Sequence, residues 1–86
     1  MVSEGFMQDI SFDILKCYGI LSEERNGWKR EVNLVSWNGR NPKIDIRDWA
    51  PGHEKAGKGI TLSREEAVKL ENYLSEILAE PERDLR

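Results

Sequence analysis

The segment KIDIRDW, residues 43–49, alternates apolar and polar side chains more regularly than any other part of the chain. A period of two is typical of a strand with one buried face. We therefore expect Ile44 and Ile46 to point into the core. The outward face would carry Lys43, Asp45, Arg47 and Trp49. Such a face is a poor core and a good platform for a ligand, because it interleaves cations with an indole ring.

Three further strands are predicted around this segment. Residues 10–15 alternate in the same way, with Ile10, Phe12 and Ile14 on the face expected to be buried, and a continuation of this first strand to Leu21 stays open. Residues 28–37 form the second strand and residues 59–62 the fourth.

Turn signals separate these strands. The Asn-Gly pairs at residues 26–27 and 38–39 suit the positive backbone angles of tight turns. Residues 50–59 contain Pro, three Gly and small residues, and are predicted to form a loop.

One helix is predicted after the last strand. Ser63 precedes Glu66 by three residues, the spacing of a capping box, and Pro81 follows the last turn. The helix should therefore run from about residue 64 to about residue 80. Its apolar stripe includes Leu70, Leu74, Ile77 and Leu78.

Four strands followed by one helix predict an α+β fold with an antiparallel sheet joined largely by hairpins. We expect a single domain over residues 1–86, with a core over about 10–80 and frayed ends. A chain of this length buries only about 60% of the surface that its unfolded form exposes. The apolar stripe of the helix exceeds what one small sheet covers. We therefore expect a homodimer that buries Leu70, Leu74, Ile77 and Leu78.

Composition argues against several classes of function. No apolar run approaches the ~18 residues of a membrane span. The first residues, MVSEGFMQDI, do not resemble a secretion signal. We expect a cytoplasmic protein without a membrane partner. Cys17 and His53 are single residues of their types, whereas zinc sites need three or four ligands. We expect no metal, no cofactor and, without a recognisable nucleophile motif, no enzyme activity.

Positive charge is concentrated in the centre of an acidic chain. The whole chain has a net charge of −3, whereas residues 28–58 hold seven basic against four acidic side chains. A local positive field steers an anionic ligand to one face, and unpaired bases stack on aromatic rings. We therefore predict a site for single-stranded nucleic acid. Its candidate residues are Lys29, Trp37, Lys43, Arg47, Trp49, Lys55 and Lys58.

Plainer interpretations stay open for the same residues. Each tryptophan, Trp28 included, can equally belong to a core or an interface. Arg47 can pair with Asp45 on its own strand face. The GKG sequence at residues 57–59 is not a phosphate-binding P-loop and can be a simple turn. A second class of function is a protein-interaction module that docks a peptide or a polymerase subunit on the aromatic surface.

The segments PKIDIRDW and KAGKGITLSREE, in this order, resemble the single-stranded-DNA-binding core of the transcriptional coactivator family known as positive cofactor four. The similarity spans roughly residues 10 to 78 and looks closest to the bacterial, YdbC-like branch, so association with a bacterial nucleoid stays open. It implies a homodimer of strongly curved four-stranded sheets, each with a C-terminal helix. It also implies that the concave surfaces of these sheets bind single-stranded DNA with little sequence preference.

The same resemblance implies which residues bind. The family's basic and aromatic positions fall on Lys43, Arg47, Trp49, Lys55 and Lys58 and, with a weaker match, on Lys29 and Trp37. Binding of RNA in place of DNA stays open, because stacking and phosphate contacts do not read the 2′-hydroxyl group. The process served, whether transcription, replication or repair, stays open as well.

Overall fold

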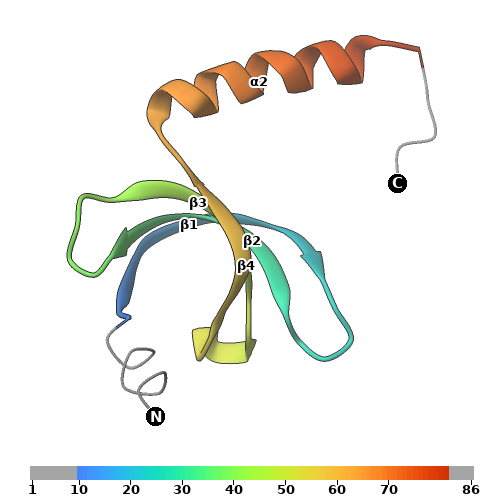
Figure 1. Cartoon of the computed structure of the whole chain (residues 1–86). Coiled ribbons are helices and arrows are strands. Elements are labelled where there is room, and N and C mark those ends of the chain that lie inside the picture. Colours follow the sequence, from blue (N-terminus) through green and yellow to red (C-terminus); the bar gives the residue numbers. More distant parts are fainter. Residues whose placement is uncertain (1–9, 82–86) are drawn as a thin grey trace.

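The computed structural model describes residues 10–81. Within this range the chain forms a four-stranded antiparallel sheet followed by an α-helix, and each strand pairs with its neighbour in the sequence (Figure 1). The predicted α+β fold class is confirmed. The elements are β1 (Phe12–Glu23), β2 (Lys29–Trp37), β3 (Lys43–Trp49), a short 3-10 turn η1 (Pro51–His53), β4 (Ala56–Leu62) and α2 (Arg64–Ala79).

Both Asn-Gly pairs form turns, as predicted. Gly27 adopts a φ of 91°, and its N–H donates to the Glu24 carbonyl over 3.0 Å. Asn38 and Gly39 adopt φ values of 53° and 74°, which Asn and Gly tolerate better than other residues. These turns place β1, β2 and β3 side by side.

β1 is longer and more irregular than its sequence pattern predicts. It continues past Leu21 to Glu23, and its register against β2 shifts three times. An extra residue in one strand bends that strand and increases its twist. Figure 1 accordingly shows strands that bow around one concave side. Ile10, predicted to begin this strand, lies before it and is exposed.

β4 begins at Ala56, three residues before the predicted start at Gly59, so the loop after β3 is shorter than expected. The glycines that suggested a loop instead allow β4 to approach β3 closely. A Cβ atom on Gly59 would lie 2.5 Å from the Ile46 carbonyl oxygen and 2.6 Å from the Arg47 Cβ. A Cβ atom on Gly57 would meet the Trp28 ring at 2.8 Å, so Trp28 packs against this strand.

The buried core lies on the concave face of the sheet. Its largest fully buried side chains are Val35, Asn33, Asp45 and Trp49. Ile44 and Ile46 lie on the convex face and are only half-buried. The alternation of β3 is confirmed, but the prediction that these isoleucines face the core while Trp49 points outward is wrong. The curl of the sheet is the reason, because it brings Phe12 of β1 and His53 of η1 against the Trp49 ring.

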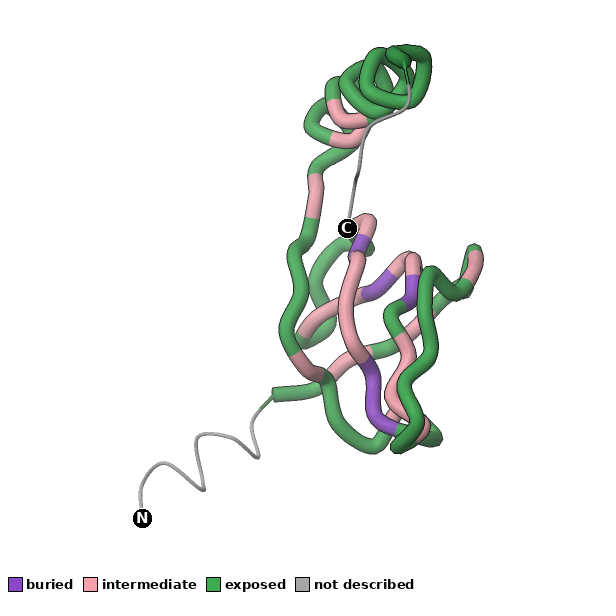
Figure 2. The backbone as a smooth tube through the Cα atoms, turned by 90° about the vertical axis from the view of Figure 1, so that its right-hand side faces the viewer, coloured by how far each residue is buried: buried purple, intermediate pink, exposed green. Residues whose placement is uncertain are grey.

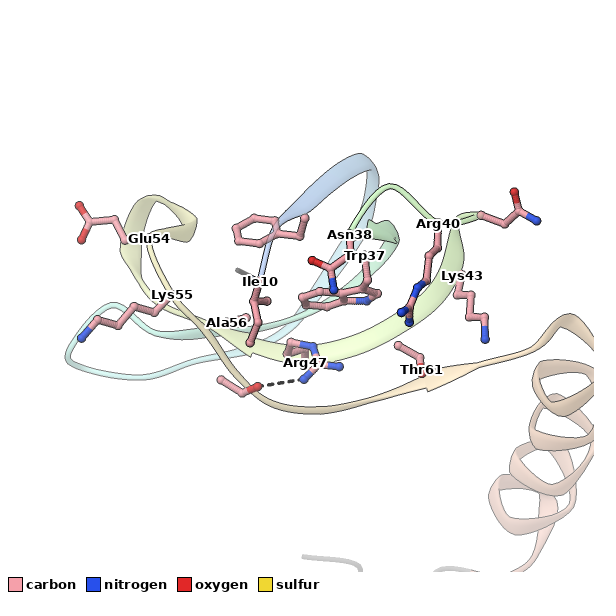
Figure 3. A pocket seen from close by; sticks show the side chains of 13 residues that line it. Ile10, Trp37, Asn38, Arg40, Lys43, Arg47, Glu54, Lys55, Ala56 and Thr61 are labelled. Carbon is pink, nitrogen blue, oxygen red and sulfur yellow. Dashed lines mark hydrogen bonds between the residues drawn. The ribbon is translucent and has the colours of Figure 1, made fainter. Parts of the chain in front are cut away.

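The helix begins as predicted and stands away from the sheet on its convex side (Figures 1 and 3). The Ser63 hydroxyl accepts from the Glu66 N–H, and the Glu66 carboxylate accepts from the Ser63 N–H, which completes the capping box. Leu70 is half-buried, whereas the rest of the predicted dimer stripe is exposed: Leu74, Ile77 and Leu78. Figure 2 shows buried segments in the sheet and none in α2. No helix within residues 10–81 has the length and apolar character that a membrane span requires.

Candidate nucleic-acid interface

A pocket of about 820 Å³ lies on the concave side of the sheet (Figure 3). It lies between the turn after β2 and the segment that leads into β4, and the start of β1 forms one wall. Its lining residues are Ile10, Phe12, Trp37, Asn38, Arg40, Asn41, Lys43, Arg47, Glu54, Lys55, Ala56, Gly57 and Thr61. The pocket therefore combines aromatic and apolar surface with four basic side chains.

Arg47 is held rigidly at the floor of the pocket. Its Nε and Nη2 atoms donate to the two carboxylate oxygens of Asp45 at 3.0 and 2.9 Å, and Nη1 donates to the Gly57 carbonyl at 2.9 Å. Asp45 has no exposed surface, and the Arg47 side chain is 16% exposed. A buried carboxylate needs such a partner, because an unpaired charge in the interior is strongly unfavourable. The ion pair expected as the plainer interpretation of Arg47 is thus present.

A cluster of rings supports this arginine. The Arg47 guanidinium lies 4.8 Å from the centre of the Trp37 ring, a cation–π contact. Trp37 and Trp49 are nearly parallel, with 6.1 Å between ring centres and 7° between planes. Phe12 contacts both tryptophans at ring distances of 5.9 and 4.8 Å. Phe12 and Trp37 line the pocket, whereas Trp49 lies beneath it.

A polar cluster is buried at the other end of the concave face. The Glu31 carboxylate accepts from Asn33 Nδ2 at 3.0 Å and lies 2.9 Å from His53 Nε2. His53 adopts a φ of 59°. Burial by itself would raise the pKa of Glu31, but the hydrogen bonds from Asn33 and His53, with the charges of His53 and Lys29, outweigh it and lower that pKa. The cluster ties η1 to β2 and so fixes the start of the pocket-lining segment at Glu54.

Three cations at the pocket have no counter-ion within the part of the chain that the structure describes. No ion pair joins Arg40, Lys43 or Lys55 to an acid among residues 10–81. Glu54 is the one acidic side chain among the described lining residues, and Figure 3 shows it directed away from the Trp37 ring. The pocket is therefore positively charged, in a chain whose net charge is negative.

The seven predicted binding residues divide into two groups. The pocket brings together Trp37, Lys43, Arg47 and Lys55. Trp49 is only 1% exposed and offers no surface to a ligand. Lys29 and Lys58 lie outside the pocket. The hydrogen bond from Arg30 and the charges of Arg30 and Lys58 lower the pKa of Asp48, which places Lys58 near that carboxylate.

Sequence reasoning missed three residues that line the pocket. Phe12 was assigned to a buried strand face, because nothing in the sequence showed which side the curled sheet would enclose. Arg40 and Asn38 belong to the second Asn-Gly turn, which was read only as a connection. The sequence did offer a signal for Arg40. This cation lies in the turn that directly follows Trp37 at the end of a strand, so its side chain can lie beside that ring.

A metal site is not found in the part of the chain that the structure describes. No three His, Cys, Asp or Glu side chains come together there in a way that could hold an ion. Cys17 is exposed, and its sulfur lies 4.0 Å from a Glu31 oxygen.

We compared this chain, with its curled sheet, concave pocket and following helix, with known protein families. The model of the transcriptional coactivator p15 (PC4) matches residues 25–73. The chain belongs to the PC4 family. An uncharacterized protein of Treponema pallidum (strain Nichols) is 42% identical over 73 residues, which cover 85% of this chain and 86% of that protein. Membership in the PC4 family associates the chain with nucleic-acid binding and transcription.

Proposed function

We propose that this PC4-family chain binds single-stranded DNA in its concave pocket and has no catalytic activity. The observation that carries the proposal is the convergence of Arg40, Lys43 and Lys55 on a pocket that is also lined by the aromatic rings of Phe12 and Trp37. Cations without a local counter-ion attract phosphates, and aromatic rings attract unpaired bases. A duplex hides its bases in the stack, so these two features together favour single strands.

The phosphates are assigned to Arg40, Lys43 and Lys55. All three are exposed, so each can approach a backbone phosphate without losing an existing ion pair. Each phosphate contact releases counterions from the nucleic acid, which makes the affinity fall with salt concentration. Lys29 and Lys58 would add to the general positive field only.

The bases are assigned to Phe12 and Trp37. Both rings line the pocket and are half-buried, so each keeps surface on which a base can stack. Stacking of this kind contributes about 1–3 kcal/mol per base and tolerates any sequence, because every base has a π face. Trp49 supports Trp37 from beneath and is not assigned to direct contact.

We further infer that the chain acts as a homodimer. Leu74, Ile77 and Leu78 of α2 are exposed, and the convex-face residues Ile44 and Ile46 are only half-buried. A second copy is the occupant that fits, because a two-fold contact presents the same apolar helix and sheet face from both sides. Two concave pockets would then face away from the shared interface.

A fluorescence anisotropy titration tests the binding proposal. Labelled single-stranded DNA, duplex DNA and RNA of one mixed sequence are titrated with the protein at two salt concentrations. We expect single-stranded DNA to bind more tightly than duplex, and its log affinity to fall with log salt at a slope of about −0.7 per phosphate contacted. Equal affinity for all three would reduce the protein to a general polyanion binder. Salt-insensitive binding of a protein, without binding of any nucleic acid, would favour the protein-interaction module instead.

A further inference from the structure

We propose that Arg47 reads a base rather than a phosphate, and that the base it prefers is guanine. This inference rests on the proposed function, because it requires a single strand in the concave pocket. It adds a preference at one position to binding that otherwise tolerates any sequence. Asp45 is the positioning residue that makes the reading possible.

The charge of Arg47 is already compensated. Asp45 is completely buried and binds the guanidinium through Nε and Nη2 at 3.0 and 2.9 Å. A phosphate at Arg47 would compete with this carboxylate and would be repelled by it. Arg40, Lys43 and Lys55 have no such counter-ion within residues 10–81 and are better placed for phosphates. Arg47 therefore contributes to binding in another way.

The orientation of Arg47 is fixed, and part of its hydrogen-bonding capacity is unused. Asp45 and the Gly57 carbonyl take Nε and one N–H each of Nη1 and Nη2, so two of the five guanidinium N–H groups have no partner among the described residues. The group lies against Trp37 at 4.8 Å and cannot turn without losing these contacts. A planar donor group of fixed orientation suits a base edge with two neighbouring acceptors.

The surroundings of Arg47 supply further donors and few acceptors. The Asn38 Oδ1 accepts from the Ser11 N–H at 2.8 Å, which fixes the amide and leaves its Nδ2 without an acceptor among residues 10–81. Figure 3 shows Asn38 and Arg40 beside the Trp37 ring, and Glu54 directed away from it. Thr61 can donate or accept. A base that presents an amino group to Arg47 therefore places a donor against other donors, which disfavours its binding.

Guanine is the base whose edge fits this set. Its O6 and N7 atoms are adjacent acceptors, and arginine binds them in a bidentate manner, whereas adenine replaces O6 with an amino donor. The two purines stack almost equally, so a difference between them reports hydrogen bonding at the edge.

The test uses the unmodified protein and a series of oligothymidylates of about 15 nucleotides, each with one central replacement. Guanine and inosine, which both carry O6 and N7, should bind at least about fivefold more tightly than adenine. 7-Deazaguanine lacks N7 and should lose most of this gain. Equal affinity for the guanine and adenine oligonucleotides overturns the inference and leaves the proposed function standing. Failure of every oligonucleotide to bind overturns both.

Two variants locate the preference. Arg47→Lys keeps the positive charge but loses the planar pair of donors, so the guanine-to-adenine ratio should fall to about one while the salt slope stays unchanged. Lys43→Gln should weaken binding to every oligonucleotide and reduce the salt slope by about 0.7, with the ratio kept. A Lys43→Gln protein that loses the ratio, or an Arg47→Lys protein that keeps it, contradicts the assignment of the reading residue.

Discussion

Asp45 lies under the pocket without exposed surface and binds Arg47 through both carboxylate oxygens. The neighbouring interior positions are also polar, since Asn33 and Glu31 are buried on β2. Each of these groups would be costly alone, and each is therefore fixed by a specific partner. At the scale of single residues, the concave face is a set of polar contacts around a small aromatic cluster.

Replacement of Asp45 by Asn tests how much the ion pair stabilises the fold. The amide cannot neutralise the partly buried Arg47, so the free energy of unfolding should fall by about 2–4 kcal/mol. Urea unfolding followed by tryptophan fluorescence measures this difference. Asp13→Asn is the matched control, because Asp13 is exposed on β1, and its change should stay within about 0.5 kcal/mol. Equal losses in the two variants would show that the pair contributes little.

Glu31 should make the fold sensitive to acid. Its hydrogen bonds with Asn33 and His53 outweigh burial, so its pKa in the folded chain lies below the ordinary value. The unfolded chain then takes up a proton first as the pH falls. The stabilisation is complete above the ordinary pKa and is lost as the pH falls through the folded pKa.

In the Glu31→Gln variant, the free energy of unfolding should therefore fall less steeply between about pH 5 and pH 3 than in the parent. Urea unfolding at pH 7, 4 and 3 compares the variant with the parent. Glu71→Gln, on the exposed surface of α2, serves as the control and should keep the slope of the parent. A Glu31→Gln protein that loses as much stability on acidification as the parent does would assign the acid sensitivity elsewhere.

At the scale of elements, the two sides of the sheet depend on different sequence features. β1 bends through its three register shifts, and β4 lies close to β3 because Gly57 and Gly59 carry no side chains. A Cβ atom added at Gly59 would lie 2.5 Å from a backbone oxygen of β3. A Cβ atom added at Gly19 in β1 would have no neighbouring atom within 4 Å. The same residue type is thus required in one strand and replaceable in the other.

Gly59→Ala should lower the free energy of unfolding by about 1–3 kcal/mol, because β4 must move away from β3 to admit the methyl group. Gly19→Ala should be neutral within about 0.5 kcal/mol, since its added methyl group meets open space. Thermal and urea unfolding of the two variants measure the difference. Equal stability of the two alanine variants would mean that the close approach of β3 and β4 is not constrained by Gly59.

The elements also show what the sequence could and could not predict. β3 and the capped helix follow from local patterns, because an alternation of seven residues and a capping box depend only on neighbours in the chain. The extent of β1 and β4 depends on bulges and close packing against other strands. Trp49 was misplaced for the same reason: its face could be identified from alternation, but the side on which the sheet curls could not.

At the scale of the whole molecule, the chain is more extended than a compact domain of its length. Its radius of gyration is 15.4 Å, whereas a compact domain of this length has about 12 Å. Its longest dimension is 51 Å, and α2 stands apart from the sheet (Figures 1 and 2). Leu74, Ile77 and Leu78 form an exposed apolar stripe on α2, and such a stripe is typical of an interaction surface. If a second copy covers this stripe, as we propose, folding and dimerisation are coupled in one cooperative transition.

Leu74→Glu tests this proposal, because it places a charge in the centre of the apolar stripe. We expect the variant to be monomeric by sedimentation equilibrium at concentrations where the parent is dimeric, and to unfold at a lower temperature. Val68→Glu is the control, since Val68 is similarly exposed and lies six residues away, about 120° around the helix axis. It should leave both the mass and the unfolding temperature unchanged. If the parent itself sediments as a monomer, the proposal of a second copy is wrong, and the concentration dependence of stability expected for a dimer will be absent.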